Sequence, residues 1–460
     1  MSAPPTSPPS AVSVSRWQSR SMDLSPASPV ASPVKALMAA IEDTGRDERR
    51  GGYSRPVYSA AERDLREWFT AEALRRGLAV ETDANGILWA WWDLPGDSAA
   101  GIDGTSGVPE RRGALVTGSH LDSVPGGGAF DGPLGVAGAL AAVDLLQARE
   151  REGGLVRNRA LAVAVFPEEE GSRFGVACLG SRLLAGAIDP AKALSLRDVD
   201  GNTFADVARA NGLDPELMGR DEAVLSRIGD FVELHVEQGR GLNTEEFMDA
   251  AGRGPAVAVG GSVLGHGRWR FTIAGQGNHA GTTLMADRAD PMVAAAQLIV
   301  AVRQTAAARQ GARATVGRLE PVPGGTNVIA SRVDLWLDVR HPEDAVTAAL
   351  VEKIHGQAQR IAAMEGCTVR LTEESYSGTV HFDAALQRSL EQSVARTVPG
   401  APVLATGAGH DAGVLAALVP AGMLFVRNPS GISHSPEEYV EDADAELGVA
   451  ALADALQDLL

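Results

Sequence analysis

The chain has 460 residues, which is more than one ordinary hydrophobic core holds, so we expect two domains. A formal net charge of -18 argues against nucleic acid or an anionic membrane as a partner, and two cysteines exclude a disulfide framework. Histidine and carboxylate side chains therefore remain as possible metal ligands. No apolar run is long enough to span a membrane and no secretory segment is evident, so we expect a cytoplasmic protein.

The beginning of the chain predicts a disordered head, a helix and a hairpin. Residues 1–33 are rich in Ser and Pro and contain few bulky apolar residues, so they lack the material for a core. Residues 60–76 carry apolar side chains at helical spacing, and Gly77 suits the end of a helix. Residues 80–92 predict two strands around an Asn-Gly turn.

A short apolar run at 114–117 predicts a buried parallel strand, and polar residues follow it. His120 and Asp122 come first, then a glycine-rich loop, Asp131 and a helix at about 133–146. The carboxyl end of a strand in an open α/β sheet is where ligands bind, so these side chains suggest a metal site. In the alternative interpretation, His120 caps the strand, Asp122 makes a turn and Asp131 N-caps the helix.

Two further predicted apolar strands carry or precede residues that could bind a metal or take part in catalysis. The run 161–166 ends in three consecutive glutamates, Glu168 to Glu170, which repel one another unless cations compensate them. A solvated acidic loop is the alternative for this stretch. The strand at 231–236 carries His235, although a single histidine in an apolar strand is more often a core residue than a ligand.

The pattern changes at about residue 264. Residues 268–273 and 332–339 alternate polar and apolar side chains, as half-exposed antiparallel strands do. Residues 291–308 and 342–366 predict helices, and the buried-strand pattern returns at 422–426. A small α+β domain is therefore predicted inside a larger α/β domain.

The predicted organisation has three parts. Residues 1–33 form the head. Residues 34–263 and 376–460 form a catalytic, metal-binding α/β domain with a mostly parallel sheet. Residues 264–375 form an inserted α+β domain, with an antiparallel sheet and two helices, that acts as a lid or dimerisation domain.

Nine short motifs occur in one order along the chain: Gly-Ser-His120-Leu-Asp122, Phe-Asp131-Gly-Pro, Glu169-Glu170-Gly-Ser-Arg-Phe, Leu-His235-Val-Glu-Gln238-Gly, Asn278-His279-Ala-Gly-Thr-Thr, Asn327-Val-Ile, Asp338-Val-Arg340-His, Gly407-Ala-Gly-His410-Asp and Gly-Ile-Ser-His434. Each is weak alone. As a set, from about residue 34 to the end, they resemble the M20 metallo-amidohydrolases, in the branch of N-carbamoyl-L-amino acid hydrolases, β-ureidopropionases and allantoate amidohydrolases. His235 separates this branch from peptidases of the same fold, which place a carboxylate there.

The resemblance implies two divalent metal ions per subunit, bridged by Asp131. One ion would also be held by His120 and His235, and the other by Glu170 and His434. Imidazole and carboxylate together suit Zn²⁺ or Mn²⁺.

The resemblance also implies three catalytic side chains. Asp122 would accept the other ring N–H of His120 and fix its tautomer. Glu169 would take a proton from the attacking water and pass it to the leaving nitrogen. His279 would stabilise the oxyanion.

The implied substrate is a small carboxylate with a ureido group, bound by Arg340, Asn327, Gln238, His279, Gly407 and Gly409. Arg340 is the expected carboxylate clamp because its fork allows bidentate binding, and a surface ion pair is the alternative. The family also implies a homodimer through the inserted domain. His410 receives no role, and Cys178 and Cys367 are interpreted as buried small hydrophobes.

Allantoate is the favoured substrate, with N-carbamoyl-L-amino acids and β-ureidopropionate as alternatives. An aminopeptidase of the same fold is less favoured because of His235, Arg340 and Asn327. A catalytically inactive metal-binding module is less favoured because Glu169 and Glu170 are both present.

Overall fold

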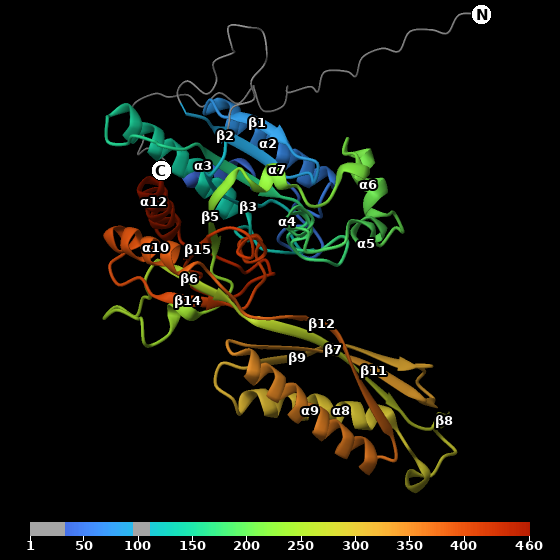
Figure 1. The fold of residues 1–460 in the computed structure, drawn as a ribbon. Helices are drawn as coiled ribbons and strands as arrows, with labels where there is room; N and C mark the ends of the chain where they lie inside the picture. The colour runs from blue at the N-terminus through green and yellow to red at the C-terminus, as the bar shows by residue number, and fades with distance from the viewer. Residues whose placement is uncertain (1–32, 95–110) are drawn as a thin grey trace, which may run out of the picture. The chain divides into compact units, whose positions relative to one another are not determined.

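The computed structural model describes residues 33–94 and 111–460. The predicted head at 1–33 lies outside this range except for its last residue, which begins helix α1 (Pro33–Ala40). The chain divides into two compact units (Figure 1). Of the described residues, unit 1 comprises those up to Gly261 together with Phe382–Leu404 and Gly409–Leu460, and unit 2 comprises Ser262–His381 and Ala405–Ala408.

The central sheet of unit 1 has the strand order β1-β2-β4-β3-β5-β15-β6, and β14 also pairs with β6. The pairs β4–β3, β3–β5 and β5–β15 are parallel, whereas β2–β4 and β15–β6 are antiparallel. The strand bounds are β1 Ala79–Thr82, β2 Leu88–Trp92, β3 Ala114–His120, β4 Leu161–Phe166, β5 Ile228–Val236, β6 Val257–Val263, β14 Val403–Thr406 and β15 Ala421–Val426.

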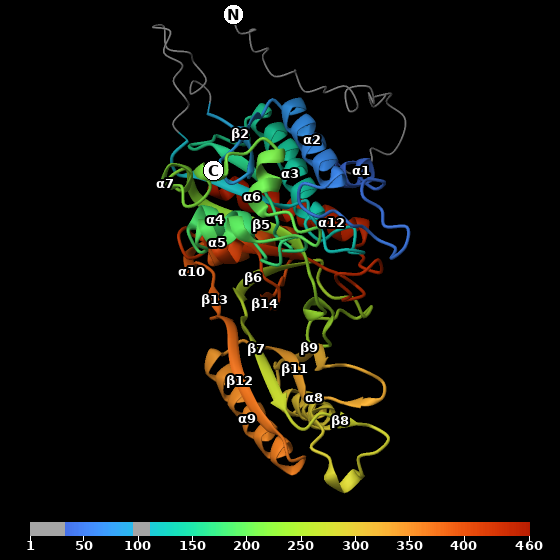
Figure 2. The same ribbon diagram turned by 90° about the vertical axis from the view of Figure 1, so that its right-hand side faces the viewer.

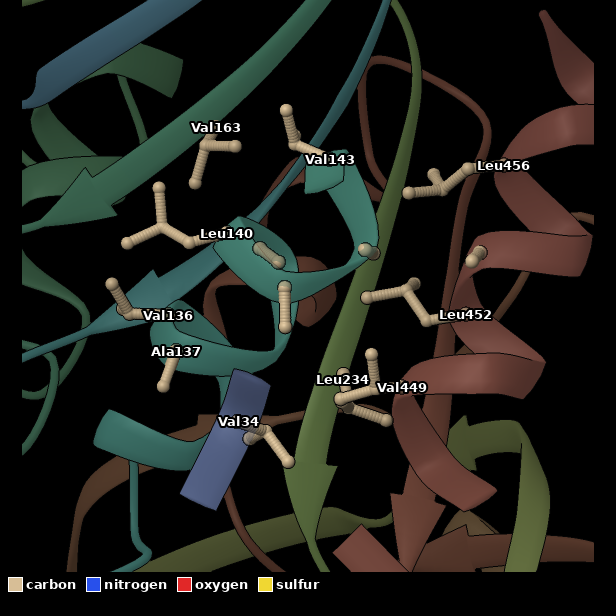
Figure 3. Packing of buried hydrophobic residues seen from close by; sticks show 14 of the residues in the cluster. Val34, Val136, Ala137, Leu140, Val143, Val163, Leu234, Val449, Leu452 and Leu456 are labelled. Carbon is tan, nitrogen blue, oxygen red and sulfur yellow. The ribbon is translucent and has the colours of Figure 1, made fainter. Parts of the chain in front are cut away.

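Helix α3 lies against the sheet beside the C-terminal helix α12. Figure 3 shows Val136, Leu140 and Val143 of α3 among apolar side chains of the sheet and of α12. The main helices of unit 1 are α2 Ala60–Arg75, α3 Pro133–Arg151, α10 Ala384–Thr397 and α12 Asp442–Leu459. Since α3 is followed by β4, and β3 and β4 are parallel neighbours, α3 is the crossover of a βαβ unit.

The shorter helices of unit 1 are α4 Leu179–Ala185, α5 Pro190–Ser195, α6 Phe204–Ala210, α7 Glu222–Leu225 and α11 Asp411–Leu415. Helices α4, α5 and α6 contribute to a second apolar cluster, in which the rings of Phe174 and Phe204 pack edge to face at 5.1 Å. This cluster supports the segment that follows the acidic residues at the end of β4.

Unit 2 contains an antiparallel sheet of order β12-β7-β11-β9, with both long helices on one face (Figure 2). The apolar residues of strands and helices form one core that includes Phe271, Leu335, Leu298 and Ile354. The bounds are β7 Gly265–Ala274, β8 Asn278–His279, β9 Arg313–Val322, β10 Val328–Ile329, β11 Arg332–His341, β12 Thr368–Ser377, β13 Val380–His381, α8 Pro291–Ala307 and α9 Asp344–Met364.

The predicted fold class is confirmed: a mostly parallel sheet with helices in one unit, and an antiparallel sheet with two helices in the other. The hairpin, the strands β3, β4, β5, β7, β11 and β15, and the helices α2, α3, α8 and α9 occur where the sequence predicted them. Over the described ranges, no helix is both long and apolar enough to cross a membrane.

We predict that Gly135 is required for α3 to approach β5. A Cβ atom at this position would lie 2.3 Å from the carbonyl oxygen of Leu234. Gly135→Ala should lower the free energy of unfolding by about 1–3 kcal/mol, the usual cost of overpacking. Gly356→Ala in α9 is the matched control, because nothing lies within 4 Å of its Cβ and alanine favours a helix. Urea unfolding checks both variants, and equal stabilisation by the two would contradict the prediction.

Candidate active site

The carboxyl ends of the neighbouring strands β3 and β5 bring two histidines together. His120 is the last residue of β3 and His235 the last but one of β5, and their stacked rings lie 5.8 Å apart. Asp131, just before α3, reaches both rings. Its Oδ1 is 3.5 Å from His120 Nε2 and 3.3 Å from His235 Nε2. All three side chains are buried.

Backbone carbonyl groups fix the orientation of both imidazoles. His120 Nδ1 lies 3.0 Å from the carbonyl oxygen of Asp122, and His235 Nδ1 lies 2.9 Å from that of Val236. Because a carbonyl oxygen only accepts, Nδ1 carries the proton in each ring, and in the neutral ring Nε2 is left with its lone pair. Each Nε2 lacks a hydrogen-bond partner among the described residues, although each faces Asp131. A cation between these atoms would satisfy all of them.

The second oxygen of Asp131 faces a different set of partners. Asp131 Oδ2 lies 3.5 Å from His434 Nε2, which is itself 3.3 Å from Glu170 Oε2. His434 is half-exposed and has φ of +57°, a conformation that non-glycine residues rarely adopt. The hydrogen bond with Glu170 raises the pKa of His434 to about 9.

Asp131 is thus shared by two clusters that could each hold a metal ion. One is His120, Asp131 and His235, and the other is Asp131, Glu170 and His434, with the ligand atoms of each within 4.8 Å of one another. Burial alone would raise the pKa of Asp131, but the adjacent imidazoles of His120 and His235 hold it well below its usual value. Imidazole nitrogen and carboxylate oxygen are donors that a divalent transition metal prefers, so the residues fit the metal pair.

Gln238 contacts both parts of this site. Its Nε2 donates to Asp131 Oδ2 at 2.8 Å and lies 3.4 Å from His434 Nε2. Its Oε1 has no partner among the described residues and remains an acceptor for another group.

The carboxylate of Asp122 does not accept the ring N–H of His120, as the sequence analysis expected it to. Its carboxylate Oδ1 lies 3.7 Å from His120 Nδ1, so the ring N–H is accepted by the backbone carbonyl and not by the side chain. The carboxylate instead accepts the backbone N–H groups of Glu169 and Glu170, both at 3.2 Å. Asp122 therefore orients the acidic segment after β4, and burial raises its pKa to about 7.

The three consecutive glutamates face different surroundings. Glu169 is buried, and its Oε2 lies 3.6 Å from His120 Nε2 while its Oε1 accepts from Cys178 Sγ at 3.4 Å. Burial raises the pKa of Glu169 well above its usual value. Glu168 turns away at φ of +56° and accepts the N–H groups of Arg173 and Phe174. Cys178 is buried, as predicted, but its contact with Glu169 was not expected.

Glu438 is a residue of this site that the sequence analysis missed. Its Oε1 accepts the backbone N–H groups of Phe130 at 2.9 Å and Asp131 at 3.0 Å, and the side chain is buried. A Cβ at Gly128 would lie 2.2 Å from the Glu438 carboxylate, so glycine is needed there. Glu438 follows His434 by four residues and so ties the Asp131 loop to the His434 loop. Nothing in the sequence distinguishes it from its exposed neighbour Glu437.

A buried polar layer lies beneath His235. His410 packs against it with ring centroids 4.6 Å apart. Glu233 accepts from Ser119 Oγ at 2.8 Å, and Asp411 accepts from Ser181 Oγ. Glu233, His235 and His410 form a third group with metal-ligand geometry. Because Glu233 already accepts from a hydroxyl and a backbone N–H, we interpret this layer as support for the ring of His235.

Four of the expected substrate-binding residues belong to unit 2. The guanidinium of Arg340 on β11 donates to both carboxylate oxygens of Asp338, at 2.8 and 3.0 Å, and to the carbonyl oxygen of Gly407. His279 on β8 and Asn327 are exposed neighbours, since the N–H of Ala280 donates to the carbonyl oxygen of Asn327 at 3.0 Å. Gly409, by contrast, belongs to unit 1.

Comparison with known proteins identifies relatives along most of the chain. The model of peptidase family M20/M25/M40 matches residues 116–458. An N-carbamoyl-L-amino acid amidohydrolase of Geobacillus stearothermophilus is 35% identical over 404 residues, which cover 87% of this chain and 92% of that protein. An allantoate amidohydrolase of Bacillus subtilis (strain 168) is 31% identical, covering 89% and 93%. A crystal structure of a hydantoinase/carbamoylase family amidase from Burkholderia multivorans has a TM-score of 0.74 at 29% identity, covering 92% and 96%.

We predict that Glu438 sustains metal affinity through the backbone of Asp131. Glu438→Ala removes the acceptor of two backbone N–H groups and should weaken binding of Zn²⁺ or Mn²⁺ by about 10–100-fold, as loss of an outer partner does. Glu438→Gln keeps an accepting Oε1 and should bind metal nearly normally. Metal titration checks both variants, with Glu437→Ala as the exposed control. Equal affinity in Glu438→Ala and wild type would contradict the role.

Proposed function

Because the chain belongs to peptidase family M20/M25/M40, we propose that it is a binuclear metal-dependent amidohydrolase that cleaves the ureido C–N bond of a small carboxylate. The observation that carries this proposal is the position of Asp131 between two clusters of imidazole and carboxylate donors. His120 and His235 would hold one ion, Glu170 and His434 the other, and Asp131 both. Zn²⁺ and Mn²⁺ are the metals that suit these donors.

Bound divalent ions would polarise the ureido carbonyl group and lower the pKa of a water molecule. Glu169 is the residue placed to take that water's proton, because its Oε2 faces the cluster while its Oε1 is occupied by Cys178. Burial raises the pKa of Glu169, which suits a group that accepts a proton and then returns it to the leaving nitrogen. Asp122 fixes the backbone that carries Glu169.

We assign substrate recognition to Arg340, His279, Asn327, Gln238, Gly407 and Gly409. Arg340 has five N–H donors, of which three are used by Asp338 and Gly407. One N–H on each of Nη1 and Nη2 remains for a substrate carboxylate, and Asp338 holds the fork in place. His279 and Asn327 are exposed and carry groups that suit an oxyanion or a ureido oxygen. Gln238 Oε1 suits a ureido N–H. Gly407 and Gly409 let the backbone approach the ligand.

Allantoate and N-carbamoyl-L-amino acids remain the two candidate substrates. The sequence around Leu424–His434 favoured allantoate. The relative at 35% identity is named for N-carbamoyl-L-amino acids, and the relative at 31% identity for allantoate. Both substrates carry a ureido group and a carboxylate, so the same donors serve either. A homodimer through unit 2 and a cytoplasmic location stay predictions.

One assay separates these candidates. Purified protein supplied with Mn²⁺ or Zn²⁺ is incubated with allantoate, β-ureidopropionate and several N-carbamoyl-L-amino acids, and ammonia release is measured. We expect turnover of one ureido acid and loss of activity after chelation. Cleavage of dipeptides instead would identify an aminopeptidase, and no turnover by metal-loaded protein would favour an inactive metal-binding module.

We predict different defects at the two neighbouring glutamates. Glu169→Gln should retain both metals and lose activity by about 10²–10⁴-fold, the usual contribution of a general acid–base group. Glu170→Gln should lose metal from one site, because its Oε2 faces His434. Metal analysis together with turnover distinguishes the two, and equal metal loss in both variants would refute the division of roles.

We predict that Arg340 acts on the substrate carboxylate. Arg340→Ala should lower kcat/KM for the acid substrate by roughly 2–5 kcal/mol of transition-state stabilisation, because it leaves the carboxylate unpaired. Arg340→Lys should also be impaired, since it lacks the planar fork. The effect should largely disappear for an amide analogue, and metal content should stay unchanged. If acid and amide substrates lose the same factor, Arg340 has a structural role only.

A further inference from the structure

Unit 1 contains a cavity of about 250 Å³ that is separate from the metal-binding clusters. Residues of α1, of the segment between Ile41 and Arg55 and of the beginning of α12 line it, together with Phe130 and Leu134. None of the residues that form the metal-ligand clusters is in its wall. A cavity of this size holds a small metabolite and not a large ligand.

A buried cation without a counter-ion lines this cavity. The Arg55 side chain is 1% exposed, and it donates from Nε to the carbonyl oxygen of Thr44 at 2.8 Å and from Nη2 to that of Ile41 at 3.2 Å. Among residues 33–94 and 111–460, Arg55 Nη1 has no hydrogen-bond partner, and the Arg55 guanidinium forms no ion pair with a carboxylate. Burial lowers the pKa of Arg55 to about 10. An unpaired buried guanidinium is costly, so an anion would stabilise it.

Arg46 is a second arginine of the cavity wall. Arg46 and Arg55 both face the ring of Tyr53, with their Cζ atoms 5.5 and 4.0 Å from its centroid. Contact with an aromatic face attracts a cation but does not neutralise it. The remaining charged residues of the wall are Lys35, Glu42 and Asp442, of which Lys35 and Asp442 pair with each other. Arg46 also forms an ion pair with Asp43 at 3.5 Å, so Arg55 is the arginine of the wall that lacks a counter-ion among the described residues.

The rest of the wall is largely apolar. Val34, Met38, Phe130, Leu134 and Val440 contribute aliphatic and aromatic surface. We propose that this cavity binds a small monocarboxylate with an apolar body, whose carboxylate lies on Arg55 and Arg46 and whose hydrocarbon part contacts the apolar wall. This inference is independent of the proposed hydrolysis.

Such a ligand would contact both segments that Glu438 holds together. Phe130 precedes Asp131 and donates its N–H to Glu438, while Val440 follows Glu438 by two residues. Such a ligand would therefore lie beside the loop that carries Asp131.

Calorimetric titration of the metal-loaded protein with butyrate and hexanoate, with butyramide as the neutral control, tests the proposal. We expect both carboxylates to bind, hexanoate more tightly because it buries more apolar surface, and butyramide not to bind. Arg46→Gln removes a half-exposed side chain and should weaken binding roughly tenfold, as expected for loss of a charge-assisted hydrogen bond. Ala445→Met fills the cavity from α12 and should abolish binding. Arg63→Gln, an exposed arginine of α2 outside the cavity, is the matched control.

The variants Arg46→Gln and Ala445→Met distinguish binding in the cavity from binding at another site. A carboxylate bound at the metal ions would be unaffected by Arg46→Gln and Ala445→Met, so binding that survives both overturns the proposal. Failure of the wild-type protein to bind either acid also overturns it. Arg55→Gln is a further test. If its melting temperature shows that this variant is folded, the substitution should abolish binding of both acids.

Discussion

The site depends on how one carboxylate, that of Asp131, is held between two pairs of partners. Its two oxygens face different clusters, so any rotation of the side chain would disturb both. The backbone N–H of Asp131 is fixed by Glu438, and the next residue, Gly132, has φ of +83°. A Cβ at Gly132 would lie 2.5 Å from the ring of His120, so glycine is required on both conformational and steric grounds.

The acidic segment after β4 shows how buried carboxylates are stabilised in a chain whose net charge is -18. Carboxylates that are removed from water need donors, and backbone N–H groups supply them without adding mobile charge. Asp122 accepts from two backbone N–H groups of this segment, and Glu168 accepts from two that follow it. Glu169 instead keeps only a thiol donor on one oxygen, so its other oxygen remains available for chemistry.

The sequence predicted the buried strands because their apolar runs are uninterrupted, and with them a metal site of His120, Asp122 and Asp131 after β3. His235 was assigned to that site only through the family resemblance. Strands β9 and β12 were missed because they are the edges of the unit 2 sheet and carry many polar side chains. Strand β6 contains two glycines and gave no apolar run. Contacts between distant segments, such as that of Glu438 with the Asp131 loop, leave no local pattern. The alternative in which Asp131 N-caps the helix does not hold, since Gly132 is the N-cap of α3 and the Asp131 carboxylate contacts partners far away in the chain.

The difference between buried and exposed side chains explains why the sequence identifies the family more readily than the substrate. The groups assigned to the metals and to proton transfer are mostly buried, and several lie at or just after strand ends, where geometry restricts which residues are tolerated. His279 and Asn327 are exposed, and Arg340 is only half-buried, so packing constrains them little. Asp338, on the same strand, accepts two hydrogen bonds from the Arg340 guanidinium and so fixes its orientation. In the proposed function, discrimination between ureido acids comes from groups that contact the part of the substrate beyond its carboxylate and ureido ends.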